Sequence, residues 1–600
     1  MKSNSHEEST ERDAASDPEQ GSESVEEPTG KDAANAHDTS GPPDGHERKP
    51  FRVFSAHFSG PGMLVALFFF ALSLFDSLLP RTGLFQGVVS GITIAIGYGI
   101  GALGQWLWLY LEIPTLKGRV RQIAGWIGAV LLGLFVVSAM WRHVGWQNNL
   151  RELFGMQSES PMVWLVILVV AIPVAALLLI IARSLGKLFF FFARWFDKVL
   201  PYKLSRLLGA VALGLFVWLL FTGVIEKGFF AAANEVFAPR DTRTDEGIEQ
   251  PQSALRSGGP GSLSDWDTLG RKGRAFVASG PTVDDLNEFS GGGAIEPIRA
   301  YVGLKASSTI GGRAEIALDE LIRTGAFERE ILVIATTTGT GFLDAHAVDP
   351  LEYMYNGDTA IVGVQYSYLP SWISLLADKE VTRDTSRAVF DWIHAYWATL
   401  PEDSRPEIYI YGLSLGSFGV ESILTSINMI NEPIDGAFMV GPPFVNELHK
   451  ELTDDRDQGS PASLPVYQAG KTVRFTAEID ALGEPEATWD ETKVVYLQHA
   501  SDPVVFFSWD LAFEQPDWLK PGQHGPDVSN EFVWFPIVTL WQVALDLPAA
   551  GSVPEGFAHL YTVEANAAGW AGVTQPDGWT DDDTQELKDF LSGIAEYNSE

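Results

Sequence analysis

The sequence contains no cysteine among its 600 residues. This absence excludes disulfides, thiolate nucleophiles and cysteine-ligated metals. Basic residues are also scarce: 41 Lys and Arg stand against 77 Asp and Glu, which gives a formal net charge of −36 at pH 7. A protein that binds nucleic acid needs a basic surface to meet the phosphates, so we expect no nucleic-acid partner.

Residues 1–50 lack Phe, Trp and Tyr altogether, and they hold thirteen acidic residues against five basic ones. Such a segment cannot bury enough apolar surface to offset the entropy that is lost on ordering. We therefore predict a disordered acidic tail over 1–50. The tail also lacks the short apolar core of a secretory signal peptide.

Residues 51–230 have the opposite composition, with long apolar runs such as MLVALFFFALSLF that leave no polar face for water. A helix needs about 20 residues to cross the hydrocarbon core of a bilayer. Five stretches are long enough, which predicts a transmembrane domain of about five helices. We place these spans near 58–79, 84–110, 122–141, 161–182 and 207–226.

The loops between these stretches differ in basic charge, and Lys and Arg are retained on the cytoplasmic side of a membrane. Twelve Lys or Arg lie directly before the first span (Arg48, Lys49 and Arg52) and in the second and fourth loops, against three in the alternate loops, namely Arg81, Arg142 and Arg151. This asymmetry predicts a multi-pass plasma-membrane protein with a cytoplasmic N-terminus. An odd number of spans then places the C-terminal domain outside the cytoplasm, and one span more or fewer reverses that side.

Residues 231–270 change to Gly, Ser, Pro, Asp and Glu without periodicity, which predicts a linker. Beyond it, short apolar runs alternate with helical patterns over 271–600, as in ILVIATTTGTG, TAIVGVQYSYL and EIYIYGLSLGS. Strand followed by helix, repeated, is typical of a mostly parallel sheet with helices on both faces. The expected fold is thus an α-helical transmembrane bundle followed by an α/β domain.

The segment 412–416, Gly-Leu-Ser-Leu-Gly, matches the pattern G-x-S-x-G. The pattern alone is weak in a chain with 58 glycines, but its context is specific. The preceding EIYIY is a predicted strand and the following SFGVESILTSINMI is an amphipathic helix, so Ser414 occupies a sharp strand-to-helix turn that exposes its hydroxyl. We predict Ser414 to be a catalytic nucleophile.

A serine hydroxyl needs a base to remove its proton and an acid to orient that base, and in this fold they follow in the order Ser, acid, His. Asp502 comes directly after the predicted strand VVYLQ, and His559 lies in a late loop. We predict Asp502 and His559 as the partners. His499 is the rival histidine, and the other candidate carboxyl groups are Asp480 and Asp510.

The negative oxygen that forms during acyl transfer needs hydrogen-bond donors already in place. One predicted donor is the backbone amide of Leu415, directly after the nucleophile. The other is expected in the loop ATTTGTGF, where we favour the amide of Thr338 or a neighbour. This loop lacks the Lys of a phosphate-binding Walker motif, so a nucleotide site is not expected.

Together, the multi-span N-terminal region, TTTGTGF, YSYLPSW and GLSLGSFG resemble a bacterial, mainly actinobacterial, α/β-hydrolase family that has an N-terminal transmembrane domain. The resemblance extends from the first span to the end of the chain. It implies an α/β-hydrolase domain with serine-hydrolase chemistry, and it implies no particular substrate.

Aromatic residues suggest where a substrate pocket lies. Gly339, Tyr368 and Trp372 are expected at the same sheet edge as Ser414, and Trp541 belongs to an apolar insertion between Asp502 and His559. The insertion is expected either to pack over the sheet or to form a lid on an apolar pocket.

The leading hypothesis is a serine esterase or lipase that acts on an acyl ester, with a lipid or a cell-envelope glycolipid as the candidate substrates. The alternatives are an acyltransferase with the same three residues and a non-catalytic membrane scaffold or transport-associated protein. The sequence shows no clustered metal ligands, so we expect neither a metal nor another cofactor.

Overall fold

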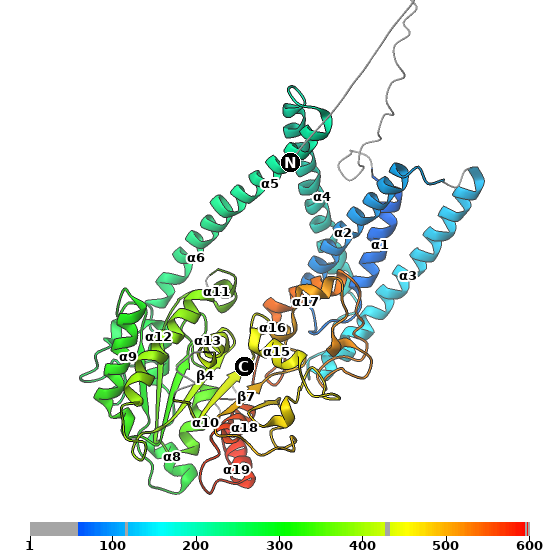
Figure 1. The fold of residues 1–600 in the computed structure, drawn as a ribbon. Coiled ribbons are helices and arrows are strands. Elements are labelled where there is room, and N and C mark those ends of the chain that lie inside the picture. Colours follow the sequence, from blue (N-terminus) through cyan, green and yellow to red (C-terminus); the bar gives the residue numbers. More distant parts are fainter. Residues whose placement is uncertain (1–57, 115–117, 378, 426–431, 595–596, 598–600) are drawn as a thin grey trace, which may run out of the picture. The chain divides into compact units, whose positions relative to one another are not determined.

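The structure is a computed structural model, and it describes residues 58–114, 118–377, 379–425, 432–594 and 597. The predicted tail over 1–50 lies outside these residues. The described part begins with apolar helices and continues into a domain built on one sheet (Figure 1).

The apolar helices correct the predicted number of spans. Among the described residues, four helices are long and apolar enough to cross a membrane: α2 (Gly83–Tyr110), α3 (Gly118–Leu153), α4 (Val163–Phe196) and a continuous helix over Tyr202–Asp241. The last comprises α5 (Tyr202–Leu220), a π-helical turn (Phe221–Ile225) and α6 (Glu226–Asp241). The first predicted span, 58–79, contains only α1 (Gly60–Ser73), because the chain leaves the helix before Pro80. Its 14 residues span about 21 Å, which is short of the ~30 Å hydrocarbon core.

Small residues allow two of these helices to pack closely. Gly83, Gly87 and Gly91 are spaced four apart on α2 and face α4. A Cβ at Gly87 would lie 2.6 Å from the Cβ of Val170, and one at Gly91 would lie 2.6 Å from that of Val174. Close backbone approach through small residues is the usual basis of helix association in membranes.

The C-terminal domain is built on a seven-stranded sheet with the order β1-β3-β2-β4-β5-β7-β6, in which every pair is parallel. The strands are β1 (Ile298–Val302), β2 (Ile331–Thr336), β3 (Thr359–Val364), β4 (Glu407–Leu413), β5 (Gly436–Val440), β6 (Val473–Thr476) and β7 (Lys493–Leu497). The strand order reverses between β2 and β4, and in open parallel sheets ligands bind beyond the carboxyl ends of the strands at such a switch point. Ser414 follows β4 directly.

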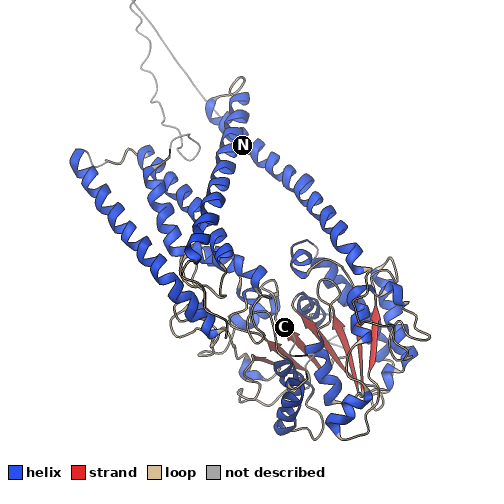
Figure 2. Ribbon diagram, turned by 180° about the vertical axis from the view of Figure 1, so that it is seen from behind, coloured by secondary structure: helices blue, strands red, loops and turns tan. Residues whose placement is uncertain are grey.

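Helices cover both faces of the sheet, as predicted (Figure 2). Successive strand residues point to opposite faces: Leu332 and Ile334 pack in one apolar core, and Val333 and Ala335 in the other. The helices of one face are α9 (Ile310–Thr324), α12 (Lys379–Trp397), α13 (Leu415–Leu424) and α15 (Glu447–Asp454). Those of the other are α7 (Gly270–Ala278), α8 (Val283–Ser290), α10 (Ala345–Met354), α18 (Val563–Thr574) and α19 (Asp581–Ser592).

The predicted linker, 231–270, is more ordered than its composition suggests. It is helical as far as Asp241, and Asp241 accepts a hydrogen bond from Gln365 at the end of β3. Farther on, the Ser257 amide donates to the Arg299 carbonyl of β1, and the Arg299 amide donates to Leu255. These bonds place 255–257 along the edge of the sheet, beside β1.

The insertion between Asp502 and His559 contains α16 (Pro503–Phe506), α17 (Val538–Asp546) and several short 3-10 turns. Its buried apolar residues form one cluster with Leu78, Leu79, Leu150 and Phe154, which lie at the ends of the apolar helices. The insertion therefore packs against the corners between the apolar helices, an arrangement that the sequence did not predict.

Candidate active site

Ser414 lies on a strained turn between β4 and α13. Its backbone has φ 54° and ψ −124°, a conformation that non-glycine residues rarely adopt. Its amide donates to the Val440 carbonyl of β5 at 2.8 Å, which holds the turn against the neighbouring strand. Strain of this kind costs about 1–3 kcal/mol and is typical of functional sites.

The glycines beside Ser414 are required by space. A Cβ at Gly412 would lie 2.4 Å from the Gly416 carbonyl carbon, and one at Gly416 would lie 2.4 Å from the Thr336 carbonyl oxygen. Both obstacles are backbone atoms that cannot rotate away. The G-x-S-x-G pattern is thus explained by the close passage of β4, α13 and the end of β2.

The side chains of Asp502 and His559 contact each other, and these are the two residues that the sequence analysis named as partners of Ser414. The Nδ1 atom of His559 is 2.5 Å from Oδ2 of Asp502, which is fully buried. The Tyr561 hydroxyl donates to the same oxygen at 2.8 Å, and the Val504 amide donates to Oδ1 at 2.8 Å. Burial alone raises the pKa of Asp502, but His559 and these hydrogen bonds outweigh it and hold that pKa below its usual range. Asp502 is therefore ionised at neutral pH.

The imidazole of His559 lies beside the end of β5. The same strand end accepts the hydrogen bond from the Ser414 amide. Gly441 follows Val440, the acceptor of the Ser414 amide, and a Cβ built on Gly441 would lie 2.6 Å from Cε1 of His559. The second ring nitrogen, Nε2, is buried and has no hydrogen-bond partner among the described residues. A buried polar atom without a partner is costly, so its presence calls for an explanation such as a role in catalysis.

The alternative candidates have other partners. His499 is within hydrogen-bond distance of Glu478 through Nε2 and of the Ala558 carbonyl through Nδ1. Asp480 accepts from the Leu482 amide, and Asp510 accepts from Ser508. Neither the rival histidine nor the two other carboxyl groups take part in the Asp502–His559 pair.

The two predicted oxyanion donors differ in whether their amides are free to bind a substrate oxygen. Leu415 is the first residue of α13, and the amides of a first helical turn have no partner within their own helix. The Thr338 amide instead donates to the Phe342 carbonyl at 3.0 Å, closing the loop that follows β2. Thr338 as the second donor is therefore wrong for this arrangement, because the loop uses that amide itself. The loop does lie beside the elbow, since Gly416 packs against Thr336.

The predicted pocket residues are dispersed. Gly339 packs against Ser371 at the start of α11 (Ser371–Ala377). The Tyr368 hydroxyl donates to Asn234 of α6, and Trp372 is 58% exposed with its ring 6.3 Å from that of Phe229. Trp541 belongs to α17, which contacts α1 and α2. These aromatic segments thus contact membrane helices or their extensions.

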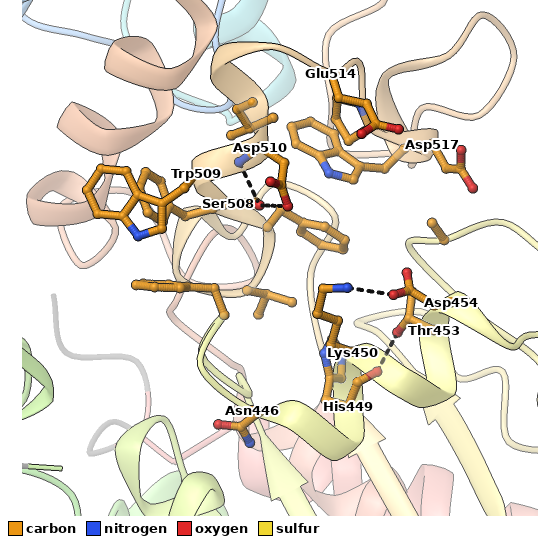
Figure 3. Close-up of a pocket in the computed structure, with 18 of the residues that line it drawn as sticks. Asn446, His449, Lys450, Thr453, Asp454, Ser508, Trp509, Asp510, Glu514 and Asp517 are labelled. Carbon is orange, nitrogen blue, oxygen red and sulfur yellow. Dashed lines mark hydrogen bonds and ion pairs between the residues drawn. The ribbon is translucent and has the colours of Figure 1, made fainter. Parts of the chain in front are cut away.

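A cavity of about 510 Å³ lies between α15 and residues 505–518 (Figure 3). Its lining combines aromatic rings, including Phe444 and Trp518, with charged groups such as Lys450 and Asp454. Neither Ser414 nor the predicted pocket residues line it. Asn446 connects it to the elbow by donating to Ser417 on α13. The amphipathic pattern of 447–454 predicts a helix, but it does not indicate a cavity wall.

No group of three His, Asp or Glu side chains that could hold a metal ion occurs in the described ranges.

The order of serine, carboxylate and histidine on this parallel sheet is that of the α/β-hydrolase class. A model described as an alpha/beta-hydrolase family matches residues 298–587, and a model described as the N-terminus of an alpha/beta-hydrolase family matches residues 74–281. The chain belongs to this α/β-hydrolase family, which confirms the family seen in the motifs; the bacterial origin stays a prediction. No curated protein and no solved structure gives a match.

Proposed function

We propose that the chain is a membrane-anchored serine hydrolase that cleaves an acyl ester through Ser414, His559 and Asp502. The observation that carries this proposal is the buried Asp502–His559 pair at the β5 turn that also holds the strained Ser414. Placement beside a bilayer suits an acyl ester of a lipid or a cell-envelope glycolipid.

The geometry suggests how each group acts. Asp502 accepts from Nδ1 of His559, which leaves Nε2 as the base that takes the Ser414 proton. The serine oxygen then adds to the ester carbonyl, and the Leu415 amide stabilises the negative oxygen. His559 returns the proton to the departing alcohol, which leaves an acyl-enzyme. Water deprotonated by the same nitrogen attacks this acyl group, and the acid and free Ser414 are released. An acyltransferase differs only in that an alcohol replaces this water.

Two contacts support an extracytoplasmic position for the hydrolase domain. The corner after α1 binds the domain through the ion pair of Arg81 with Asp546, and the end of α3 contacts it through Phe154 and Phe557. Both corners belong to the alternate loops that the sequence analysis found to be poor in Lys and Arg. The domain is therefore proposed to lie opposite the basic loops, outside the cytoplasm.

The test is labelling by a fluorophosphonate, which phosphonylates an activated serine. Solubilised wild-type protein should be labelled and Ser414→Ala should not. Ser417→Ala is a matched control from the same turn, expected to retain labelling. No labelling of folded wild type would contradict the enzyme and favour the scaffold alternative. A test ester is then incubated with the protein with and without an added alcohol. Release of the free acid indicates hydrolysis, and formation of a new ester of the added alcohol indicates transfer.

A further inference from the structure

The loop that carries His559 is held partly by its own hydrogen bonds, from the Gly556 amide to Leu560 and from the Leu560 amide to Phe557, and partly by its neighbours. The His559 amide donates to Ala550 at 3.2 Å, and the Ala558 amide donates to the Ser501 hydroxyl at 3.0 Å. Ala558 has a positive φ of 51°, which side chains other than glycine adopt reluctantly. A strained residue directly before the proposed base must be held by its surroundings.

Part of those surroundings comes from the membrane helices. Phe154, directly after α3, is fully buried, and its ring stacks on Phe557 with centroids 4.5 Å apart and planes at 27°. Phe557 stands two residues before His559. Ala558 and Val553 of the same loop belong to the apolar cluster that includes Leu150 and Phe154.

A second contact secures the other end of this segment. Arg81 and Asp546 form a buried ion pair with Nε 2.8 Å from Oδ1, and Ser77 also donates to Asp546. Gln542 of α17 donates to the Phe75 carbonyl at 3.0 Å. The segment from α17 to His559 is thus attached to two corners of the membrane region.

We propose that Phe154 is a positioning residue for the reaction, and that the membrane region completes the active site by holding the His559 loop through Phe557. This proposal rests on the proposed function of Ser414 and His559. It gives the multi-helix region a role that a single anchoring helix could not supply, because two separate corners are needed to fix both ends of the segment. Phe154 touches no reacting atom and acts only through the loop.

The test measures the rate of Ser414 phosphonylation in full-length protein in detergent, with the labelled fraction recorded separately. Phe154→Ala should slow the rate about tenfold or more, since a shift of about 1 Å in a catalytic group can cost up to ~100-fold. Phe154→Leu retains apolar bulk and should restore most of the rate. Trp141→Ala is the control, because Trp141 lies on α3, the helix that Phe154 follows, but is 86% exposed. A purely structural role would lower the labelled fraction and leave the rate of the folded fraction unchanged.

A double-mutant cycle with Phe557→Ala sharpens the result. If the two rings act as one contact, the double variant should be no slower than the slower single variant. Independent, multiplying effects would overturn the proposal, as would a Phe154→Ala rate equal to wild type. Failure of wild type to react would instead contradict the proposed function itself, so the two failures are distinguishable.

Discussion

The buried ion pair between Arg81 and Asp546 allows one prediction to be worked out in detail. The side chains are 1% and 0% exposed, so replacement of Arg81 by Ala leaves a carboxylate with little access to water. Removing one partner of a buried pair costs about 3–5 kcal/mol. Burial already raises the pKa of Asp546 above its usual range, although Arg81 and Ser77 act against this. Without Arg81 that pKa rises further.

This magnitude converts into a melting temperature. Unfolding entropy of ~2.1 cal/mol/K per residue gives about 0.7 kcal/mol/K for a domain of roughly 330 residues, so Arg81→Ala should melt about 4–7 °C lower at pH 8. The deficit should shrink at pH 5.5, because protonation removes the buried charge. Replacing both partners by apolar residues, as in Arg81→Met with Asp546→Leu, should restore most of the loss.

The assay is thermal melting in detergent, followed by tryptophan fluorescence at both pH values. Arg271→Ala serves as a matched control, since Arg271 pairs with Asp245 and the two side chains are 43% and 37% exposed. A melting temperature for Arg81→Ala within 1 °C of wild type at pH 8 would refute the reasoning, because no buried charge would then have been left unpaired.

Two further predictions concern the proposed site, and a third concerns Glu421, a buried residue of α13. Tyr561→Phe should slow phosphonylation about tenfold, because it removes a hydrogen bond to the Asp502 carboxylate, a type worth about 1.5–3 kcal/mol; an unchanged rate would contradict this. Gly416→Ala should abolish labelling and lower the melting temperature, because its Cβ would lie 2.4 Å from a carbonyl oxygen of β2. Burial raises the pKa of Glu421 to about 7, so its contribution to stability is present below the unfolded pKa and is lost as pH rises through 7. Glu421→Gln cannot titrate, and relative to wild type its stability should increase by about 2–3 kcal/mol between pH 5 and 8, as measured by melting at a series of pH values.

The sequence predicted the features that depend on local patterns. The motif around Ser414, with its strand, its glycines and its helix, is encoded within about twenty residues. The alternation of apolar residues in strands and their helical spacing in helices also follow from local geometry. Asp502 was predicted because it lies in the short connection that follows the strand β7, where it caps α16. The pairing of Asp502 with His559 followed from the chain order of the fold, and the structure brings these side chains together.

The features that the sequence did not predict depend on contacts between residues far apart in the chain. The Arg81–Asp546 pair joins residues 465 apart in sequence, and no local pattern indicates such a contact. The Trp-rich insertion was expected over the sheet or a pocket; residues 505–518 do line the cavity beside α15, but much of its apolar surface is buried against helix corners that no local pattern indicated. Hydropathy also merged α1 with the following Leu74–Leu79, which are buried by the hydrolase domain's insertion as well as by helices. Thr338 was favoured from its position in a loop, and position does not reveal which amides the loop uses itself.

The orientation proposed for the hydrolase domain no longer depends on counting spans. A count of four helices of spanning length, taken alone, would place both ends of the membrane region on one side. The contacts argue otherwise, because α1 and α3 both end at corners that bind the hydrolase domain, while the basic residues gather at the opposite turn, in Lys198 and in the adjoining ends of α4 and α5. Because the chain has no cysteine, single introduced thiols can test this. A membrane-impermeant maleimide on intact cells should label Ser158→Cys in the α3–α4 corner, and should label Val199→Cys in the basic loop only after permeabilisation. The reverse pattern would place the hydrolase domain in the cytoplasm.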